Sequence, residues 1–214
     1  MNWSEIDGWF DFEDIYDQAI ARAAESSVFV EVGAWQGRST AYMASRIKDS
    51  GKKIAFYVVD LWESSSGYGL ENVFSIFETN MFECGVRKYV LPLRESSLQA
   101  AASFADGTVD FCFIDGDHSY EAVKQDIMAW LPKVRPQGIL AGHDYLDFFD
   151  RPSAKHKATS LNSASSSGVC IDYDSLNLFH YRPPNPFPGV RQAVDELFEG
   201  RFVVQGTSWI HEAR

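Results

Sequence analysis

The sequence is poor in cysteine: its 214 residues include only Cys84, Cys112 and Cys170. No two of them have the spacing of a metal-binding or redox-active pair. Cys112 lies within an apolar run, where a small buried thiol is the ordinary interpretation. We therefore expect reduced thiols and a cytoplasmic location.

Positive charge is also in short supply. Lys and Arg number 19 against 30 Asp and Glu, and the formal net charge is −11. No cluster of basic residues interrupts this acidic background, so the phosphate backbone of a nucleic acid would be repelled. We expect no nucleic-acid partner.

Long apolar runs are absent as well. No run approaches the ~18 residues that a membrane-spanning helix requires. The acidic start of the chain, MNWSEIDGWFDFEDIYDQ, has neither the basic part nor the apolar part of a signal peptide. We expect a soluble protein without a membrane partner, and the sequence leaves open whether it forms a homo-oligomer.

The chain does have the composition and pattern of an α/β protein. Hydrophobic residues make up 45% and charged residues 23%, as in ordinary globular domains. From Ser27 onward, short apolar runs alternate with amphipathic stretches, which is typical of parallel strands joined by crossover helices. The predicted strands are 28–32, 54–60, 88–92, 109–114 and 138–142, and the predicted helices lie near 38–49, 71–83, 97–104 and 119–134. This pattern predicts a doubly wound, Rossmann-like and mostly parallel sheet.

The remaining segments fit one domain over residues 1–214. Residues 1–26 form a predicted helical cover, with an amphipathic helix at 12–25 over the sheet edge or a cofactor pocket. Residues 146–188 are rich in Ser, Ala, Lys and Pro and predict an insertion that forms part of an acceptor pocket or its lid. A helix between Pro188 and Gly200 and two strands joined at Gly206 complete the chain as a C-terminal antiparallel hairpin.

Acids, histidines and glycines gather at the predicted carboxyl ends of the strands. Ligands of open α/β sheets bind beyond these ends, which makes the residues there candidates for a functional site. They are Glu31 to Gly37, Asp60, Ser96 and Ser97, Asp115 to His118, and His143 and Asp144.

The first turn, from Gly33 to Gly37, lacks the G-x-G-x-x-G spacing of dinucleotide-binding folds. Its wider spacing suits the close approach of a ligand that has no pyrophosphate. Asp60 ends the second strand, where a carboxylate can accept hydrogen bonds from both ribose hydroxyls. Taken singly, these features are also explained by a tight turn and a helix cap, but together they indicate an adenosine ligand without bridging phosphates.

The motifs VEVGAWQGRST, YVVDLW, VDFCFIDGDHSYEAVKQDI and GILAGHDY together resemble class I S-adenosylmethionine-dependent methyltransferases. The similarity is strongest to the small-molecule O-methyltransferase branch, with its macrocin-type and catechol-type enzymes, and runs from about Val28 to Tyr145. It implies S-adenosylmethionine as the cofactor, with the methionine moiety near Glu31, the ribose on Asp60 and the adenine near Trp62. The cofactor-binding residues implied in this way are Glu31, Gly33, Ala34, Gly37, Asp60, Trp62, Ser96, Ser97 and Asp115.

The same resemblance implies a metal site, but with a departure from the family pattern. Asp115 matches an aspartate that binds a divalent cation in the metal-dependent members. Their further ligands come from an Asp-Asp or Asp-Asn pair after the fifth strand, where this chain has His143 and Asp144. Oxygen ligands suit Mg²⁺, whereas a histidine nitrogen favours Mn²⁺, Fe²⁺ or Zn²⁺, so the identity of the cation stays open. The alternative is that Asp144 caps the following segment and His143 packs against it.

His118 stands where catechol-type relatives carry a lysine that acts as general base. A histidine with a pKa near ~6.5 can take a proton from a hydroxyl at neutral pH. The alternative is a histidine that hydrogen-bonds Asp115 or Asp117 at the start of a helix. His118 and Asp115 are therefore the candidate catalytic residues.

These observations predict a methyltransferase that acts on an oxygen of a small hydroxylated molecule. Whether a divalent cation assists the reaction is left open by the sequence. One alternative is a nicotinamide-dependent, Rossmann-like oxidoreductase, which the missing third glycine of the first turn disfavours. The other is a catalytically inactive module that binds S-adenosylmethionine, which the sequence does not separate from an enzyme.

Overall fold

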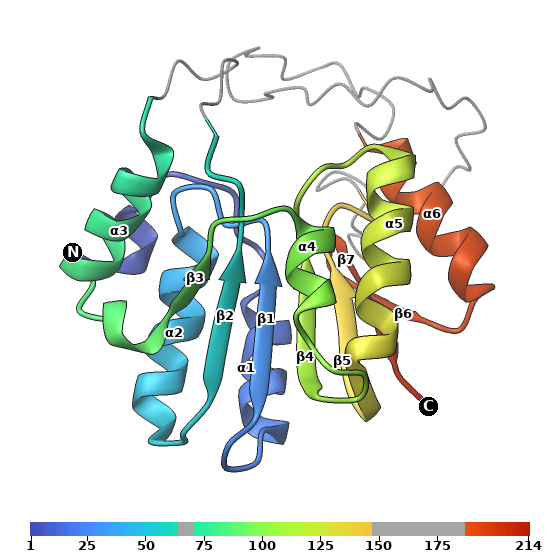
Figure 1. Ribbon diagram of the computed structural model, residues 1–214, viewed down its shortest axis with the longest axis horizontal. Coiled ribbons are helices and arrows are strands. Elements are labelled where there is room, and N and C mark those ends of the chain that lie inside the picture. The colour runs from blue at the N-terminus through green and yellow to red at the C-terminus, as the bar shows by residue number, and fades with distance from the viewer. Residues whose placement is uncertain (64–70, 147–186) are drawn as a thin grey trace, which may run out of the picture.

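The computed structural model describes residues 1–63, 71–146 and 187–214, which form a twisted sheet between two layers of helices (Figure 1). The sheet has seven strands in the order β3-β2-β1-β4-β5-β7-β6. Neighbouring strands from β3 to β5 pair in parallel, whereas β7 runs antiparallel to β5 and to β6. The strands are β1 (Val28–Val32), β2 (Ala55–Val59), β3 (Leu91–Leu93), β4 (Val109–Ile114), β5 (Val134–Gly142), β6 (Val203–Gln205) and β7 (Ser208–Glu212). The predicted fold class, including the C-terminal antiparallel hairpin, is confirmed.

Helices cover both faces of the sheet. One face carries α1 (Glu13–Arg22), α2 (Arg38–Ser50) and α3 (Val73–Glu83), and the other carries α4 (Ser97–Ala102), α5 (Tyr120–Trp130) and α6 (Pro188–Phe198). In Figure 1, α1 and α2 lie behind the sheet and α4 and α5 in front of it. Short 3-10 segments occur at Trp3–Glu5, Arg87–Tyr89 and Leu131–Lys133. Among residues 1–63, 71–146 and 187–214, no helix has both the length and the apolar character needed to cross a membrane.

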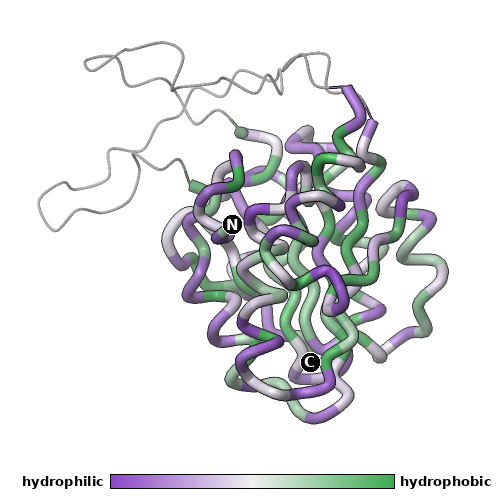
Figure 2. The backbone as a smooth tube through the Cα atoms, turned by 90° about the vertical axis from the view of Figure 1, so that its left-hand side faces the viewer, coloured by the Kyte–Doolittle hydropathy of each residue, from purple (hydrophilic) through white to green (hydrophobic). Residues whose placement is uncertain are grey.

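The alternating direction of strand side chains divides the core into two layers. On β4, Phe111 and Phe113 face α1, whereas Cys112 and Ile114 face the opposite helices. Both sets are buried, because crossover helices cover a parallel sheet on both sides. Figure 2 accordingly shows hydrophobic segments concentrated along the strands inside the molecule.

Several predicted boundaries shift in the structure. The strand predicted over 88–92 is β3 at Leu91–Leu93, because the preceding residues form a 3-10 turn. The helix predicted over 119–134 ends at Trp130, and Pro132 lies in the next 3-10 turn. Proline has no backbone N–H, and the first turn of a helix tolerates it because an N–H there would have no partner. β5 therefore begins at Val134, well before the predicted 138, and reaches its main pairing with β4 after an irregularity in the register. Of the predicted insertion at 146–188, residues 147–186 lie outside the described residues.

The parallel strands that carry the candidate residues end level with one another. Val32 pairs with Val59 on one side and with Ile114 on the other, and Ile114 pairs with Gly142. The residues that follow these four positions are therefore neighbours along one edge of the sheet. They are Gly33, Asp60, Asp115 and His143.

Backbone hydrogen bonds continue the ladder one residue beyond the strands. The N–H of Asp115 donates to the carbonyl of Val32 at 2.7 Å, and the N–H of His143 donates to the carbonyl of Ile114 at 3.1 Å. Gly33 has φ of +87°, and a Cβ added to it would overlap the carbonyl oxygen of Asp115. The close approach of the first turn to the end of β4 thus requires a glycine.

Substituting two glycines separates the effect of backbone conformation from that of close approach. Gly51 has φ of +69° and nothing within 4 Å of an added Cβ, so Gly51→Ala should cost about 1–2 kcal/mol from the left-handed backbone alone. Gly33→Ala should cost that amount plus a further 1–3 kcal/mol or more, because the Asp115 backbone cannot withdraw without breaking the β1–β4 pairing. Urea unfolding of both variants measures the difference. Equal losses would contradict the close contact.

Candidate functional site

The Asp60 carboxylate holds the first turn in place. Its Oδ2 accepts hydrogen bonds from the backbone N–H groups of Ala34 at 2.8 Å and Trp35 at 2.9 Å. Its Oδ1 accepts one from the N–H of Trp62 at 2.7 Å. The turn then enters α2 through Gly37, at φ +90°. Asp60 is half-buried, so it joins the ends of β1 and β2 while a side of it stays accessible.

The three residues predicted to lie near an adenine have structural partners. Trp62 is buried, packs against Phe74 and Phe77, and donates its indole N–H to the carbonyl of Trp35 at 2.9 Å. Ser96 is the N-cap of α4, and the Ser97 hydroxyl accepts the indole N–H of Trp130 at 2.9 Å. Trp62 therefore lies in the core, and the two serines hold the start of α4.

Glu31 lies below the first turn as a buried carboxylate. Tyr16 of α1 donates its hydroxyl to Oε1 at 2.7 Å, and Thr40 of α2 donates to Oε2. Burial is the largest influence and raises the pKa of Glu31 to about 7, against the opposing effect of hydrogen bonds from Ser39, Thr40 and Tyr16. Glu31 thus ties α1 and α2 to β1, and its two oxygens already have partners.

Four ionisable side chains meet at the ends of β4 and β5. Asp115 lies between two imidazoles, 3.6 Å from Nε2 of His118 and 3.5 Å from Nδ1 of His143. Asp144 bridges the same rings, with Oδ2 2.8 Å from His118 Nε2 and Oδ1 3.3 Å from His143 Nδ1. We call these four residues the strand-end cluster. The structure therefore brings together all the residues predicted for a base or a metal site.

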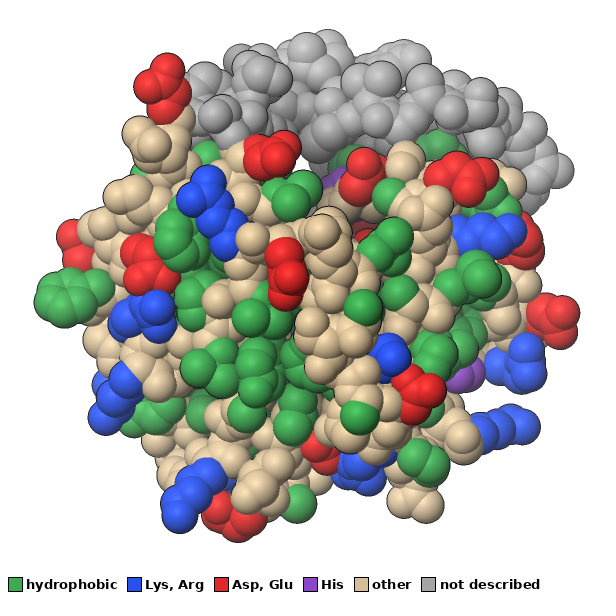
Figure 3. Space-filling model, in the orientation of Figure 1, with side chains coloured by type: hydrophobic (Ala, Val, Ile, Leu, Met, Phe, Trp, Pro, Cys, Tyr) green, Lys and Arg blue, Asp and Glu red, His purple; other side chains and the backbone are tan. Residues whose placement is uncertain are grey.

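Backbone and packing set the directions of these side chains. Asp144 has φ of +58°, a left-handed conformation that aspartate tolerates better than most residues. The His118 ring lies 4.2 Å, centroid to centroid, from Phe187 at the start of α6. Figure 3 shows histidine and acidic side chains together at the upper edge of the molecule, toward which the parallel strands point in Figure 1.

Charge pairing dominates the electrostatics of the strand-end cluster. Burial by itself would raise the pKa values of Asp115 and Asp144, but the charge of His143 and the nearby ring nitrogens of both histidines bring them below their usual range. Burial would lower the pKa of His118, yet Asp115 and Asp144 raise it to about 10, and the pKa of His143 is raised well above its usual value. Both rings are therefore cationic at neutral pH in this arrangement, and His118 can accept a proton only after it has lost one.

The donor set fits a divalent cation. One ligand atom each from Asp115, His118 and Asp144 lies within 4.8 Å of the others. Two donors that bind one ion at about 2.1 Å lie about 3.0–3.4 Å apart, and the separations between carboxylate oxygens and ring nitrogens here are 2.8–3.6 Å. The Nε2 atom of His118 is buried and has no aligned hydrogen bond, although Asp144 lies nearby. The sequence predicted His143 as the nitrogen ligand, and the structure places His118 beside the same carboxylates.

Three residues of this region were missed by reasoning from the sequence. Asp11 contacts His143, Tyr16 contacts Glu31, and the Thr207 hydroxyl contacts Asp11. Asp11 and Tyr16 belong to the predicted helical cover and Thr207 to the predicted hairpin, so their chemistry is not signalled by any motif. Only the pairing of distant segments brings them to the site.

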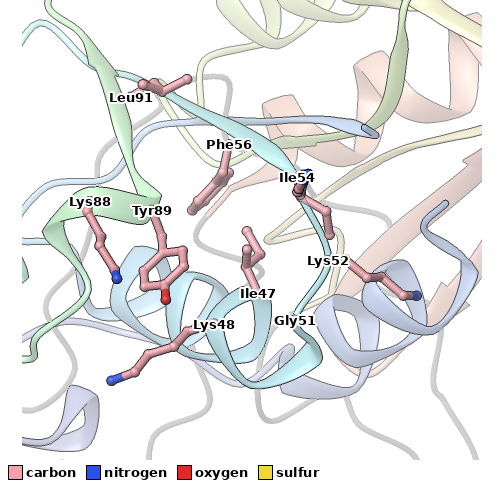
Figure 4. A pocket seen from close by; sticks show the side chains of 10 residues that line it. Ile47, Lys48, Gly51, Lys52, Ile54, Phe56, Lys88, Tyr89 and Leu91 are labelled. Atoms are coloured by element: carbon pink, nitrogen blue, oxygen red, sulfur yellow. The ribbon is translucent and has the colours of Figure 1, made fainter. Parts of the chain in front are cut away.

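A separate cavity of about 330 Å³ lies at the opposite end of the sheet, near the starts of β2 and β3 (Figure 4). Its walls combine apolar side chains with lysines and Tyr89. Lys52 is already bound to the carbonyls of Ile20 and Ala23, at 2.7 Å each. The lining residues are Ile47, Lys48, Gly51, Lys52, Lys53, Ile54, Phe56, Lys88, Tyr89 and Leu91, and none belongs to the strand-end cluster.

This chain is similar to known proteins both in sequence and in structure. The family model described as "Methyltransferase domain" matches residues 30–145. An uncharacterized protein of Sinorhizobium fredii, y4gI, is 27% identical over 118 residues, which span 54% of this chain and 13% of that protein. Cofactor-bound Rv0187 from MTB has a TM-score of 0.61 at 13% identity, over 99% of this chain and 84% of that one. An O-methyltransferase from Bacillus cereus in complex with SAH has a TM-score of 0.55 at 14% identity, over 92% and 77%.

The buried Glu31 should make stability depend on pH. Because its folded pKa of about 7 exceeds the usual 4.5, the folded chain keeps a proton that the unfolded chain loses, and stability falls as pH rises between these values. Glu31→Gln should remove about 3 kcal/mol of this decline, as judged by urea unfolding across that range. Glu212→Gln, which removes an exposed ion pair with Arg22, should keep the decline. A Glu31→Gln profile parallel to that of the unaltered chain would refute the raised pKa.

Proposed function

Because this chain belongs to the methyltransferase-domain family, we propose that it transfers a methyl group from S-adenosylmethionine to an oxygen of a small hydroxylated molecule, with the assistance of a divalent cation. The observation that carries the proposal is the position of the strand-end cluster. Asp115 and His143 continue β4 and β5 in the same row in which Gly33 and Asp60 continue β1 and β2. A cofactor over the first turn and an acceptor over the cluster would therefore lie side by side.

The first turn and Asp60 support the cofactor part of the proposal. Three backbone N–H groups orient the Asp60 carboxylate at the end of β2, where it can accept the ribose hydroxyls. The positive φ angles of Gly33 and Gly37 shape the turn beside it, and the spacing of these glycines suits the close approach of a ligand that has no pyrophosphate. The family match supports S-adenosylmethionine as that ligand.

The strand-end cluster supports the cation part. Asp115 and Asp144 would hold the ion, with the imidazoles of His118 and His143 beside them. A donor set of carboxylates and imidazoles favours Mn²⁺ or another transition metal over Mg²⁺. A bound cation lowers the pKa of a coordinated hydroxyl. His118, in its neutral form, is the group in the cluster that we assign to take the proton of the acceptor.

Charge supports a small acceptor. The net charge of −11 would repel a polyanion, whereas it does not hinder a small neutral or cationic molecule. In the transfer, the acceptor oxygen forms a bond to the methyl carbon, the sulfonium bond to that carbon breaks, and S-adenosylhomocysteine leaves. The chain's contribution is mostly to align the two reactants.

Binding of S-adenosylhomocysteine tests the cofactor assignment. The unaltered chain should bind it and gain thermal stability by linkage, as measured by calorimetry. Asp60→Asn should weaken binding about tenfold or more, because it loses a charged acceptor for the ribose hydroxyls. Asp110→Asn is a matched control at the other end of β4, where Asp110 pairs with Arg135. Binding of NADH in place of S-adenosylhomocysteine would point to the oxidoreductase alternative instead.

Methyl transfer from labelled S-adenosylmethionine to a panel of phenols, sugars and hydroxy acids tests the reaction. Activity should require a divalent cation and be lost on chelation. Asp115→Asn should reduce kcat at least about 100-fold and abolish Mn²⁺ binding, because the cluster loses a charged ligand, while S-adenosylhomocysteine affinity stays nearly unchanged. Asp110→Asn should remain active.

Two results would count against this assignment. Transfer that is insensitive to chelators would exclude the cation from the reaction. Cofactor binding without transfer to any class of acceptor would favour the inactive binding module.

A further inference from the structure

Asp11 connects the strand-end cluster to two distant parts of the chain. It lies two residues before the start of α1, and its Oδ1 is 2.8 Å from Nε2 of His143 at the end of β5. The same oxygen accepts the hydroxyl of Thr207 at 2.9 Å, from the turn between β6 and β7. The N-terminal segment, the sheet and the terminal hairpin thus meet at one carboxylate.

The contact fixes the orientation of the His143 ring. Nε2 faces Asp11, while Nδ1 on the other side of the ring faces Asp115 at 3.5 Å and Asp144 at 3.3 Å. Phe12 packs against the ring with centroids 4.9 Å apart. Only 10% of the His143 side chain is exposed, so the ring has little freedom to turn.

Thr207 in turn holds Asp11 in place. While its hydroxyl donates to Asp11, its backbone carbonyl accepts the N–H groups of Tyr145 at 2.8 Å and Leu146 at 3.1 Å. These residues directly follow Asp144, so one hairpin residue supports both Asp11 and the segment that carries a cluster carboxylate. Unlike the members of an exposed ion pair, Asp11 is only 22% exposed, and it has both His143 and Thr207 as hydrogen-bond partners.

We propose that Asp11 is a positioning residue for the divalent cation: it binds Nε2–H of His143 and so presents Nδ1, together with Asp115 and Asp144, to the ion. A carboxylate that accepts one ring N–H of a histidine fixes its tautomer and makes the other nitrogen a better ligand. This inference rests on the cation part of the proposed function. It assigns a role in the site to a segment that otherwise looks like a cover for the sheet.

Calorimetric titration of the full chain with Mn²⁺ tests the role of Asp11. Asp11→Ala should bind Mn²⁺ 10- to 100-fold more weakly, the range found when such carboxylates are removed. Asp11→Asn should restore part of the loss, because its amide oxygen can still accept Nε2–H. S-adenosylhomocysteine affinity should stay nearly unchanged in both variants, since the hydrogen bonds of Asp11 to His143 and Thr207 support the end of β5 rather than the first turn. Nitrogen-15 NMR of the Zn²⁺-loaded chain should show a proton on Nε2 of His143 and the metal at Nδ1.

Asp17→Ala is the matched control for a role in packing alone. Asp17 also fastens the N-terminal region, through Arg46 at 2.6 Å and Tyr42 at 3.0 Å, but it does not contact the cluster. The Asp17→Ala substitution should lower the melting temperature without changing Mn²⁺ affinity. Unchanged Mn²⁺ affinity in Asp11→Ala, or equal losses in the Asp11 and Asp17 variants, would overturn the positioning role while the proposed function stands. Failure of the unaltered chain to bind Mn²⁺ would overturn both the cation part and this inference.

Discussion

The level pairing of β1 with β2 and β4 is the constraint on which the rest of the structure depends. A strand register that slipped by one residue would turn every side chain to the other face of the sheet. It would also move Gly33, Asp60 and Asp115 out of line with one another, because these residues directly follow the paired residues Val32, Val59 and Ile114. Burial on both faces prevents such a slip, because Phe111 and Cys112 must face opposite layers of the core. The packing of the core and the geometry of the candidate site are therefore set by the same register.

A second constraint is the balance of charge at the strand-end cluster. Buried charges are costly unless they are paired, and here carboxylates and imidazoles alternate around a small volume. The same alternation that lets the cluster stay buried also makes it a ready set of ligands. Under the proposed function, a cation and the protons on the rings would neutralise the same carboxylates, so that binding of the ion would release those protons.

The N-terminal segment belongs to the functional end of the molecule as much as to its core. Tyr16 reaches the buried Glu31 below the first turn, and Asp11 reaches His143 above the end of β5. One short stretch of chain thereby supports both halves of the row, under the proposed cofactor and beside the proposed cation. Its aromatic neighbours supply the apolar surroundings that keep these polar contacts away from water.

Local pattern in the sequence determined the class of fold, the order of its main elements and the residues at the strand ends. Alternating apolar runs are a local signal, and Asp60, Asp115, His143 and Asp144 stand next to those runs. The same signal misjudged the start of β5, because a turn containing Pro132 and an irregular register are decided by pairing with β4 rather than by periodicity.

Tertiary structure alone decided which side chains meet. Trp62 follows the end of β2 in sequence, two residues after Asp60, yet its indole is packed in the core, and the oxygens of Glu31 are taken by α1 and α2. Asp11 is far from His143 along the chain but touches it in the fold. The physical reason is that a hydrogen bond between distant segments depends on how helices and strands pack. Spacing along the sequence carries no record of that packing.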